Sequence, residues 1–283
     1  MNSIFMAIPN KGRLHYPSVK LLQEAGIIGE IGNRELFVKT RIRGLEILLA
    51  RAADIPKLVA SGSTYLGITG ADMVVESRAK VRILQRLGFG YADIVVAGLE
   101  DAFKNRKKVR IATELPRIAK LYCRHRGVDA EIIEVSGACE IMPRMRLSDL
   151  IIDITSTGTT LRLHGLKILD KIMKSEAYLI GYPGELPQEE RETFNKTLLA
   201  IRSTVNAENM RMIMMNVPED VLEEVVKIMP GMGGPTVARI ESKENLLEVY
   251  AVVREEEVFD IVVKAKKIGA RDIIVLKLEK VIP

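Results

Sequence analysis

An alternation between short apolar runs and segments with helical spacing constrains the fold most, and it extends over residues 1–206. Short apolar runs bounded by turn residues are typical of buried strands, and apolar residues three or four positions apart are typical of helices that cover a sheet. Their alternation predicts an α/β architecture with mostly parallel sheets. The predicted strands are residues 4–8, 45–50, 65–69, 93–97, 109–112, 131–135 and 150–154, and the predicted helices are residues 16–25, 54–61, 115–126 and 161–173.

Residues 207–283 follow a different order of elements. Pro218 opens a helical segment with Glu219 and Asp220 in its first turn, where the helix dipole favours acids, and Gly269 ends a second helix. The order β-α-β-β-α-β predicts a ferredoxin-like domain. The predicted strands are residues 210–217, 236–241, 246–254 and 271–278, and the predicted helices are residues 218–229 and 255–268.

The balance of charge changes near the same boundary. Residues 1–206 hold 31 Lys and Arg against 23 Asp and Glu, a net charge of +8, whereas residues 207–283 hold 11 against 14, a net charge of −3. A basic first part suits an anionic ligand. Because aromatic residues make up only 5% and Trp is absent, with no basic stripe interleaved with aromatics, we expect phosphorylated small molecules and no nucleic acid.

Other features exclude further classes of protein. No apolar stretch reaches membrane-spanning length and the first residues do not resemble a secretory leader, so we expect a cytoplasmic protein with no membrane partner. Cys123 and Cys139 are too few for a disulfide framework or a zinc site, so we expect reduced thiols. Three scattered histidines show no spacing for a metal site, namely His15, His125 and His164.

The stretch DLIIDITSTGTTLRLHGLKIL, residues 149–169, carries the strongest local signal for a ligand. Asp153 ends a predicted strand, and five hydroxyl residues with Gly158 follow before a predicted helix. Such a turn exposes unpaired N–H groups at a helix start, and Gly158 lets the backbone approach a ligand closely. Hydroxyls can donate to phosphate oxygens, while Asp153 suits ribose hydroxyls. The stretch therefore predicts a ribose 5-phosphate site, with a turn that merely caps the helix as the alternative; its loop residues are Thr155, Ser156, Thr157, Gly158, Thr159 and Thr160.

Several segments in order along nearly the whole chain resemble the ATP phosphoribosyltransferase family, the first enzyme of histidine biosynthesis. The most specific are the loop stretch itself and PGMGGPTVARI, residues 230–240. The others are AIPNKGRL, RAADIP, LGITGADMVVE, LGFG, SGACE with Pro143, and GARDIIV.

The resemblance implies attack of adenine N1 of ATP on the anomeric carbon of phosphoribosyl pyrophosphate, with Mg²⁺ and release of pyrophosphate. It implies two catalytic α/β domains like those of periplasmic binding proteins, residues 1–92 with 180–206, and residues 93–179 with the loop. Residues 207–283 would be the regulatory domain of the long form. Histidine feedback, AMP binding and homo-oligomers, either dimers or hexamers, follow from the same resemblance, with no separate regulatory subunit.

The resemblance also assigns catalytic-domain residues to roles. Asp153 and the loop would hold the ribose 5-phosphate, and Glu140 would lie near the sugar. Lys11 and Arg13, on a turn after the first strand, would contact substrate phosphates, as would Arg51, a candidate bidentate clamp. Asp72 would face ATP or the metal, or would cap the following helix. The reaction needs no protein nucleophile, so positioning and electrostatics would carry it, and we assign no metal ligands.

In the tail the resemblance points to a histidine pocket. Thr236 matches the family pocket, Asp220 would bind the inhibitor's amino group, and Ala270 would line the site from another subunit. Family members often have an acid or Ser between PGM and PTV, where this chain has Gly233 and Gly234. That departure bears on the strength of histidine inhibition.

Two alternatives are open. The common type I phosphoribosyltransferases place an acid pair before a Thr-Gly loop, but Ile152 precedes Asp153 here. A non-catalytic regulatory module that binds phosphoribosyl compounds or nucleotides in the same cleft is the other, and the intact loop favours the enzyme over it.

Overall fold

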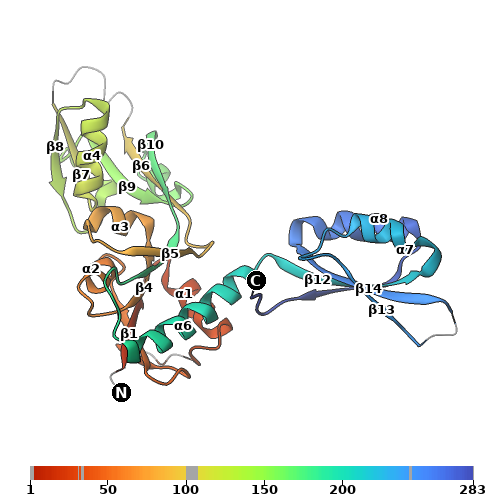
Figure 1. The fold of residues 1–283 in the computed structure, drawn as a ribbon. Helices are drawn as coiled ribbons and strands as arrows, with labels where there is room; N and C mark the ends of the chain where they lie inside the picture. The colour runs from red at the N-terminus through yellow and green to blue at the C-terminus, as the bar shows by residue number, and fades with distance from the viewer. Residues whose placement is uncertain (1–2, 31, 33–34, 100–107, 242–243, 283) are drawn as a thin grey trace. The chain divides into compact units, whose positions relative to one another are not determined.

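A computed structural model describes residues 3–30, 32, 35–99, 108–241 and 244–282 (Figure 1). The chain divides into two compact units, Met1–Thr197 and Leu198–Pro283. This division falls inside the helix α6, Gln188–Ala207, nine residues (198–206) before the boundary that charge and the order of elements indicate. The domain bounds given above stay a prediction.

Within the described residues, six strands of the first unit form one sheet in the order β2-β3-β1-β4-β11-β5. β1 lies parallel to β3 and to β4, and their buried faces hold the core of this part. The strand bounds are β1 Ile4–Pro9, β2 Phe37–Lys39, β3 Leu45–Ala50, β4 Leu66–Gly70, β5 Arg82–Arg86 and β11 Ala177–Gly181. The helices of this part are α1 His15–Glu24, α2 Ile55–Ala60 and α3 Ala71–Ser77.

A second sheet of the same unit has the order β10-β6-β9-β7-β8 among the described residues. The apolar side of the helix α4, with Ile118, Ala119 and Tyr122, packs on this sheet in one buried cluster. Met73 and Val75 of α3 pack against the same cluster, so a helix that follows the first sheet also contacts the second. The bounds are β6 Ala92–Gly98, β7 Val109–Thr113, α4 Pro116–Arg126, β8 Ala130–Glu134, β9 Leu150–Thr155, α5 Thr159–Leu163 and β10 Lys167–Ser175.

The α/β class is confirmed, but the expectation of mostly parallel sheets is wrong. The pairs β1–β3, β1–β4, β7–β8 and β7–β9 are parallel, and the other pairs of the two sheets are antiparallel. The chain crosses from the first sheet to the second after β5 and returns after β10. Antiparallel pairing of β10 with β6 and of β11 with β4 results from this return.

The helix predicted for residues 161–173 is also wrong. α5 ends at Leu163, because Gly165 takes a left-handed φ of 73° and the next amide turns back to Leu161. The Leu166 N–H donates to the Leu161 carbonyl at 2.9 Å and the Gly165 N–H to the Arg162 carbonyl at 3.0 Å, a Schellman stop. The chain then forms β10, which pairs with β6.

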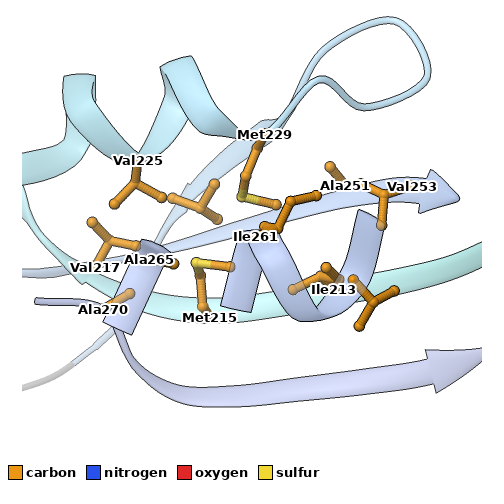
Figure 2. Packing of buried hydrophobic residues seen from close by; sticks show 12 residues of the cluster. Ile213, Met215, Val217, Val225, Met229, Ala251, Val253, Ile261, Ala265 and Ala270 are labelled. Atoms are coloured by element: carbon orange, nitrogen blue, oxygen red, sulfur yellow. The ribbon is translucent and has the colours of Figure 1, made fainter. Parts of the chain in front are cut away.

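The second unit has the expected ferredoxin-like topology, with the sheet order β13-β14-β12-β15 among the described residues. Figure 2 shows its core, where Ile213, Met215 and Val217 of β12 point toward Ile261 and Ala265 of α8. The inward residues alternate along β12, as a strand with one buried face requires. The bounds are β12 Met210–Pro218, α7 Leu222–Ile228, β13 Thr236–Arg239, β14 Leu246–Arg254, α8 Val258–Ile268 and β15 Arg271–Lys277. Across all described helices, none is long and apolar enough to cross a membrane.

Candidate functional site

The carboxyl ends of β7, β8 and β9 meet at one edge of the second sheet, because these three strands are parallel. The loop follows β9, and a short 3-10 turn that contains Glu140 follows β8. A cavity of about 320 Å³ at this edge brings the predicted acids and the loop together. It is lined by Glu140, Asp153, Ile154, Thr155, Ser156, Thr157, Thr159, Thr160 and Leu161.

The loop is held open by its own hydrogen bonds. Gly158 has a left-handed φ of 70°, and its N–H donates to the Thr155 hydroxyl at 2.9 Å. The Thr157 and Thr159 hydroxyls lie 2.9 Å apart. α5 is only five residues long, so its dipole is smaller than the sequence suggested, and side-chain donors contribute more of the positive potential.

Arg162 supplies a cation beside the loop that the sequence analysis missed. Its guanidinium donates to the Thr157 carbonyl at 3.1 Å and to the Thr159 hydroxyl at 3.2 Å. The signal was present, since a basic residue stands two positions after the last hydroxyl of the run, Thr160. A phosphate in the loop would therefore lie close to a positive charge that is already held in place.

Asp153 is a carboxylate held in an unfavourable setting. Its pKa is raised to about 6: burial is the largest cause, the nearby acids Glu140 and Glu114 add to the rise, and the Ile154 N–H, donating at 2.7 Å, opposes it. Glu114, which follows β7, was not predicted, because only the fold places it near Asp153. A carboxylate with this environment would gain by accepting hydrogen bonds from hydroxyl groups or by binding a cation.

Cys139 lies buried near these acids. Burial raises the pKa of its thiol to about 12, and the charges of Asp153 and Glu114 add to that effect. Because the thiolate is the reactive form, this thiol is unsuited to nucleophilic attack. The geometry agrees with a reaction carried by positioning and electrostatics.

The first sheet presents cations at the ends of its own parallel strands. Pro9 at the end of β1 pairs with Ala50 at the end of β3, so Lys11 and Arg51 follow neighbouring strands. The Asn10 N–H donates to the Ala50 carbonyl at 2.8 Å and ties the two loops together. Both cations are exposed, and neither forms an ion pair within the ranges that the structure describes. They are available for an anionic ligand.

Arg13 is held much more firmly than Lys11 or Arg51. One of its terminal nitrogens, Nη2, contacts both carboxylate oxygens of Asp72, at 3.1 and 3.0 Å, and Asp72 is fully buried. The Ser175 hydroxyl also donates to Asp72, at 2.6 Å. Asp72 makes no side-chain cap on α3 and points inward, so it acts on a ligand only through Arg13. The guanidinium is 24% exposed, which leaves one side open to solvent.

The cations at the strand ends of the first sheet and the loop of the second sheet both contact the segment that connects the two sheets. Arg13 donates to the Gly90 carbonyl, and the Ser156 hydroxyl donates to the Tyr91 carbonyl at 3.4 Å. These carbonyls belong to consecutive residues between β5 and β6. The cations of the first sheet and the loop of the second are thus linked through one short crossing segment.

The cavity beside the loop contains two carboxylates of the kind that bind magnesium. No group of three or more His, Cys, Asp or Glu side chains is placed to hold a metal within the described residues. Mg²⁺ commonly uses one or two protein carboxylates, several waters and substrate phosphates. Asp153 and Glu140 line one cavity and supply two such carboxylates, so they fit a magnesium ion that arrives with a polyphosphate.

The three residues predicted to bind the inhibitor histidine differ in how exposed they are in the second unit. Asp220 and Thr236 are exposed, whereas Ala270 is 5% exposed and packs in the core cluster of Figure 2. The Ala270 N–H donates to the Ala265 carbonyl at 2.9 Å, so its methyl and amide are both engaged. Gly233 and Gly234 have φ values of 80° and 96°, which explains two glycines in this turn. The roles of the three residues stay predictions.

The fold and the site define an α/β protein with hydroxyl, basic and acidic side chains gathered at the ends of its parallel strands. A family model for ATP phosphoribosyltransferase matches residues 51–203, and one for its C-terminal domain matches residues 207–280. An ATP phosphoribosyltransferase of Methanopyrus kandleri is 45% identical over 99% of this chain and all of that protein, and one of Methanocaldococcus jannaschii is 43% identical with the same coverage.

Among solved structures, one of the ATP phosphoribosyl transferase (HisG:HisZ) complex from Thermotoga maritima matches with a TM-score of 0.63 and 28% identity. The match covers 70% of this chain and 96% of that one. The chain belongs to the ATP phosphoribosyltransferase family, the enzymes of the first step of histidine biosynthesis.

Proposed function

We propose that this chain transfers the phosphoribosyl group of phosphoribosyl pyrophosphate to N1 of ATP and releases pyrophosphate. The observation that carries the proposal is the single cavity in which Asp153, Glu140 and the hydroxyl loop meet. Membership of the family supports the same activity. As a biosynthetic enzyme, it would work in the cytoplasm.

The loop and the acids would divide the sugar phosphate between them. The hydroxyls of Thr157 and Thr159, with Arg162 behind them, would donate to the 5-phosphate. Asp153 and Glu140 would accept hydrogen bonds from ribose hydroxyls and place negative charge near the anomeric carbon, which becomes positive in the transition state. The bond from that carbon to pyrophosphate breaks as the bond to adenine N1 forms, so no protein nucleophile is needed.

The cations of the first sheet would receive the leaving group. Lys11 and Arg51 are exposed and Arg13 is fixed by Asp72, so together they would neutralise pyrophosphate or the triphosphate of ATP. Asp153 and Glu140 would also hold Mg²⁺, which supplies further neutralisation of the polyphosphate when bound.

The test is an assay of the purified chain with ATP, phosphoribosyl pyrophosphate, magnesium and a pyrophosphatase, following the ultraviolet absorbance of N1-phosphoribosyl-ATP. Asp153→Ala should lower turnover about a hundredfold or more while the circular dichroism spectrum is unchanged. Asp129→Ala, an exposed acid directly before β8, is the control and should keep wild-type rates. A folded wild-type chain that binds phosphoribosyl pyrophosphate and makes no product would indicate a non-catalytic binding module instead.

We further propose that residues 207–283 make the enzyme sensitive to histidine. The match of the C-terminal family model and the ferredoxin-like topology support this assignment. A chain with its own regulatory domain would need no separate subunit, unlike the protein of the HisG:HisZ complex. AMP binding and assembly into dimers or hexamers belong to the same proposal.

The regulatory proposal is tested by a chain that stops after Glu208. The full chain should lose activity when histidine is added, and the truncated chain should not respond. The oligomeric state of both must be measured, because truncation can also disrupt assembly. A soluble truncated enzyme with full histidine inhibition would place the regulatory site elsewhere.

A further inference from the structure

A second charged cavity, of about 410 Å³, lies between the end of α3 and the side of α4. None of its lining residues belongs to the loop, to the acids beside it or to the cations of the first sheet. Four of them are basic and two are acidic: Arg78, Arg117, Lys120, Arg124, Glu76 and Glu134. The cavity is therefore a cation-rich site that the proposed reaction does not use.

The basic side chains converge because of helix geometry. Arg117, Lys120 and Arg124 are three and four positions apart, so they lie along one face of α4. Arg78 is the C-cap residue of α3, has a left-handed φ of 57°, and lines the cavity on the side of α3. In the described part of the chain, Arg78, Lys120 and Arg124 form no ion pair. Against the four cations stand the two acids of the cavity, so the lining carries an excess of two positive charges (four minus two).

Arg117 is the most informative of the four. Its Nε and Nη1 atoms are buried and have no hydrogen-bond partner among the described residues. Buried charged donors without an acceptor are costly and are normally paired. Because Nε and Nη1 lie on different edges of the guanidinium, each needs an acceptor of its own, and phosphate oxygens are suitable acceptors for Arg donors.

The acids of the cavity do not satisfy Arg117. Glu76 uses both carboxylate oxygens to accept the backbone N–H groups of Arg117 and Ile118, each at 2.9 Å. The first backbone donors of α4 are thus already paired, and the unpaired groups are the side-chain cations. Glu134 is exposed at the end of β8, and together with Glu76 it sets two acids against four cations.

We propose that this cavity binds a small phosphate-bearing anion, with Arg117 as its buried ligand and Lys120 and Arg124 at its rim. The volume suits a ligand larger than a single ion, either pyrophosphate or the phosphate of a nucleotide. Because α3 follows a strand of the first sheet and α4 a strand of the second, the bound anion would contact helices of both. Its binding would join the same two helices that Glu76 already connects.

The test is isothermal titration calorimetry of the full chain in chloride buffer, with pyrophosphate and AMP as separate probes. Wild-type protein should show two binding events for at least one probe. Arg117→Gln should weaken one event by at least about tenfold and leave the other, since charge-assisted hydrogen bonds are lost. Thr157→Val in the loop should do the reverse. A response to pyrophosphate alone identifies an inorganic anion as the ligand, and one to AMP alone identifies a nucleotide.

A second variant keeps the test independent of folding. Lys120→Gln with Arg124→Gln removes two exposed rim cations and should weaken the same event, with a circular dichroism spectrum like that of the wild type. Lys57→Gln, an exposed cation of α2, is the matched control and should bind as wild type does. The proposal is overturned if the wild type shows a single event that only Thr157→Val removes, or if Arg117→Gln and the rim variant both bind each probe unchanged.

Discussion

The two sheets of the first unit hold their charged site residues in different ways. At the first sheet Arg13 is bound to the fully buried Asp72, and Ser175 holds that carboxylate in turn. At the second sheet Asp153 has no cation paired with it among the described residues, and burial, with a smaller contribution from the neighbouring acids, raises its pKa. The charges of Arg13 and Asp72 are already paired before any ligand binds, whereas the carboxylate of Asp153 gains a partner only from a bound ligand or cation.

This difference teaches how stability and function are divided between the sheets. A buried ion pair contributes to folding mainly because removal of one partner leaves the other uncompensated. A desolvated acid lowers stability in order to keep a strong acceptor in place, as functional sites often do. The same kind of substitution should therefore have opposite effects on stability at the two edges.

The largest expected effect is on the first sheet. Asp72→Ala leaves the partly buried Arg13 guanidinium without its partner and should lower the free energy of unfolding by about 3 kcal/mol, measured by urea denaturation. Ser175→Ala should cost about 1 kcal/mol by the same measurement, because one hydrogen bond to the carboxylate is lost. An Asp72→Ala protein as stable as the wild type would show that the pair does not act as a clamp.

The second prediction concerns Asp153 and pH. Burial raises its pKa from the ordinary 3.8 of an aspartate to about 6 in the folded chain, so the folded state binds this proton more tightly than the unfolded chain does. The folded state then loses stability as pH rises from about 4 to about 6, and the loss persists above that range. Asp153→Asn should be more stable than the wild type by about 2 kcal/mol at pH 8 and by little at pH 4. Thermal melts at both values measure the gap, and an equal gap at both would contradict the prediction.

The third prediction separates backbone strain from ligand binding. Gly158 and Gly127 have left-handed φ values of 70° and 66°, so alanine at either position should cost about 1 kcal/mol of unfolding free energy. The Cβ at Gly158 would lie 3.4 Å from Arg162 Nη1, while that at Gly127 meets open space. Gly158→Ala should therefore raise the KM for phosphoribosyl pyrophosphate, whereas Gly127→Ala should leave it unchanged. Equal KM values in both variants would remove the loop from the binding site.

The smallest effect should come from Asp54. Asp54 lies at the N-cap of α2, but its side chain makes no capping hydrogen bond there. Asp54→Ala should change the free energy of unfolding by less than about 0.5 kcal/mol in the same urea experiment. A loss of about 1 kcal/mol would mean that the carboxylate does cap the helix in solution.

The sequence predicted the loop because its signal is local. An acid at a strand end, a dense run of hydroxyls and one glycine occupy adjacent positions, and the cavity gathers nearly all of them. The ferredoxin-like domain, residues 207–283, was predicted for a similar reason. Each of its strands and helices shows its own spacing of apolar residues and is bounded by its own turn residues. The Gly165 stop was as local as these, but the apolar pairs at 168–169 and 172–173 fit a helix as well as a strand.

Contacts between residues far apart in the chain could not be predicted from the sequence. Arg13 and Asp72 are 59 positions apart, and Ser175 is 103 positions from Asp72, so only the fold reveals their cluster. Glu114 joins Asp153 for the same reason. β5 and β11 were missed because β5 is a mostly polar strand and β11 is a short run whose place beside β4 depends on the return of the chain.

The position of β11 also has a consequence for how the chain folds. β11 lies between β4 and β5, so the first sheet is interrupted until residues 177–181 arrive. The strands of the second sheet, residues 92–175, all precede it in the chain. On a ribosome the second sheet can therefore complete its strand pairs first, while the earlier strands wait with an unpaired edge. We expect nascent chains that end near residue 176 to protect the second sheet from proteolysis and to leave β4 and β5 open to cleavage.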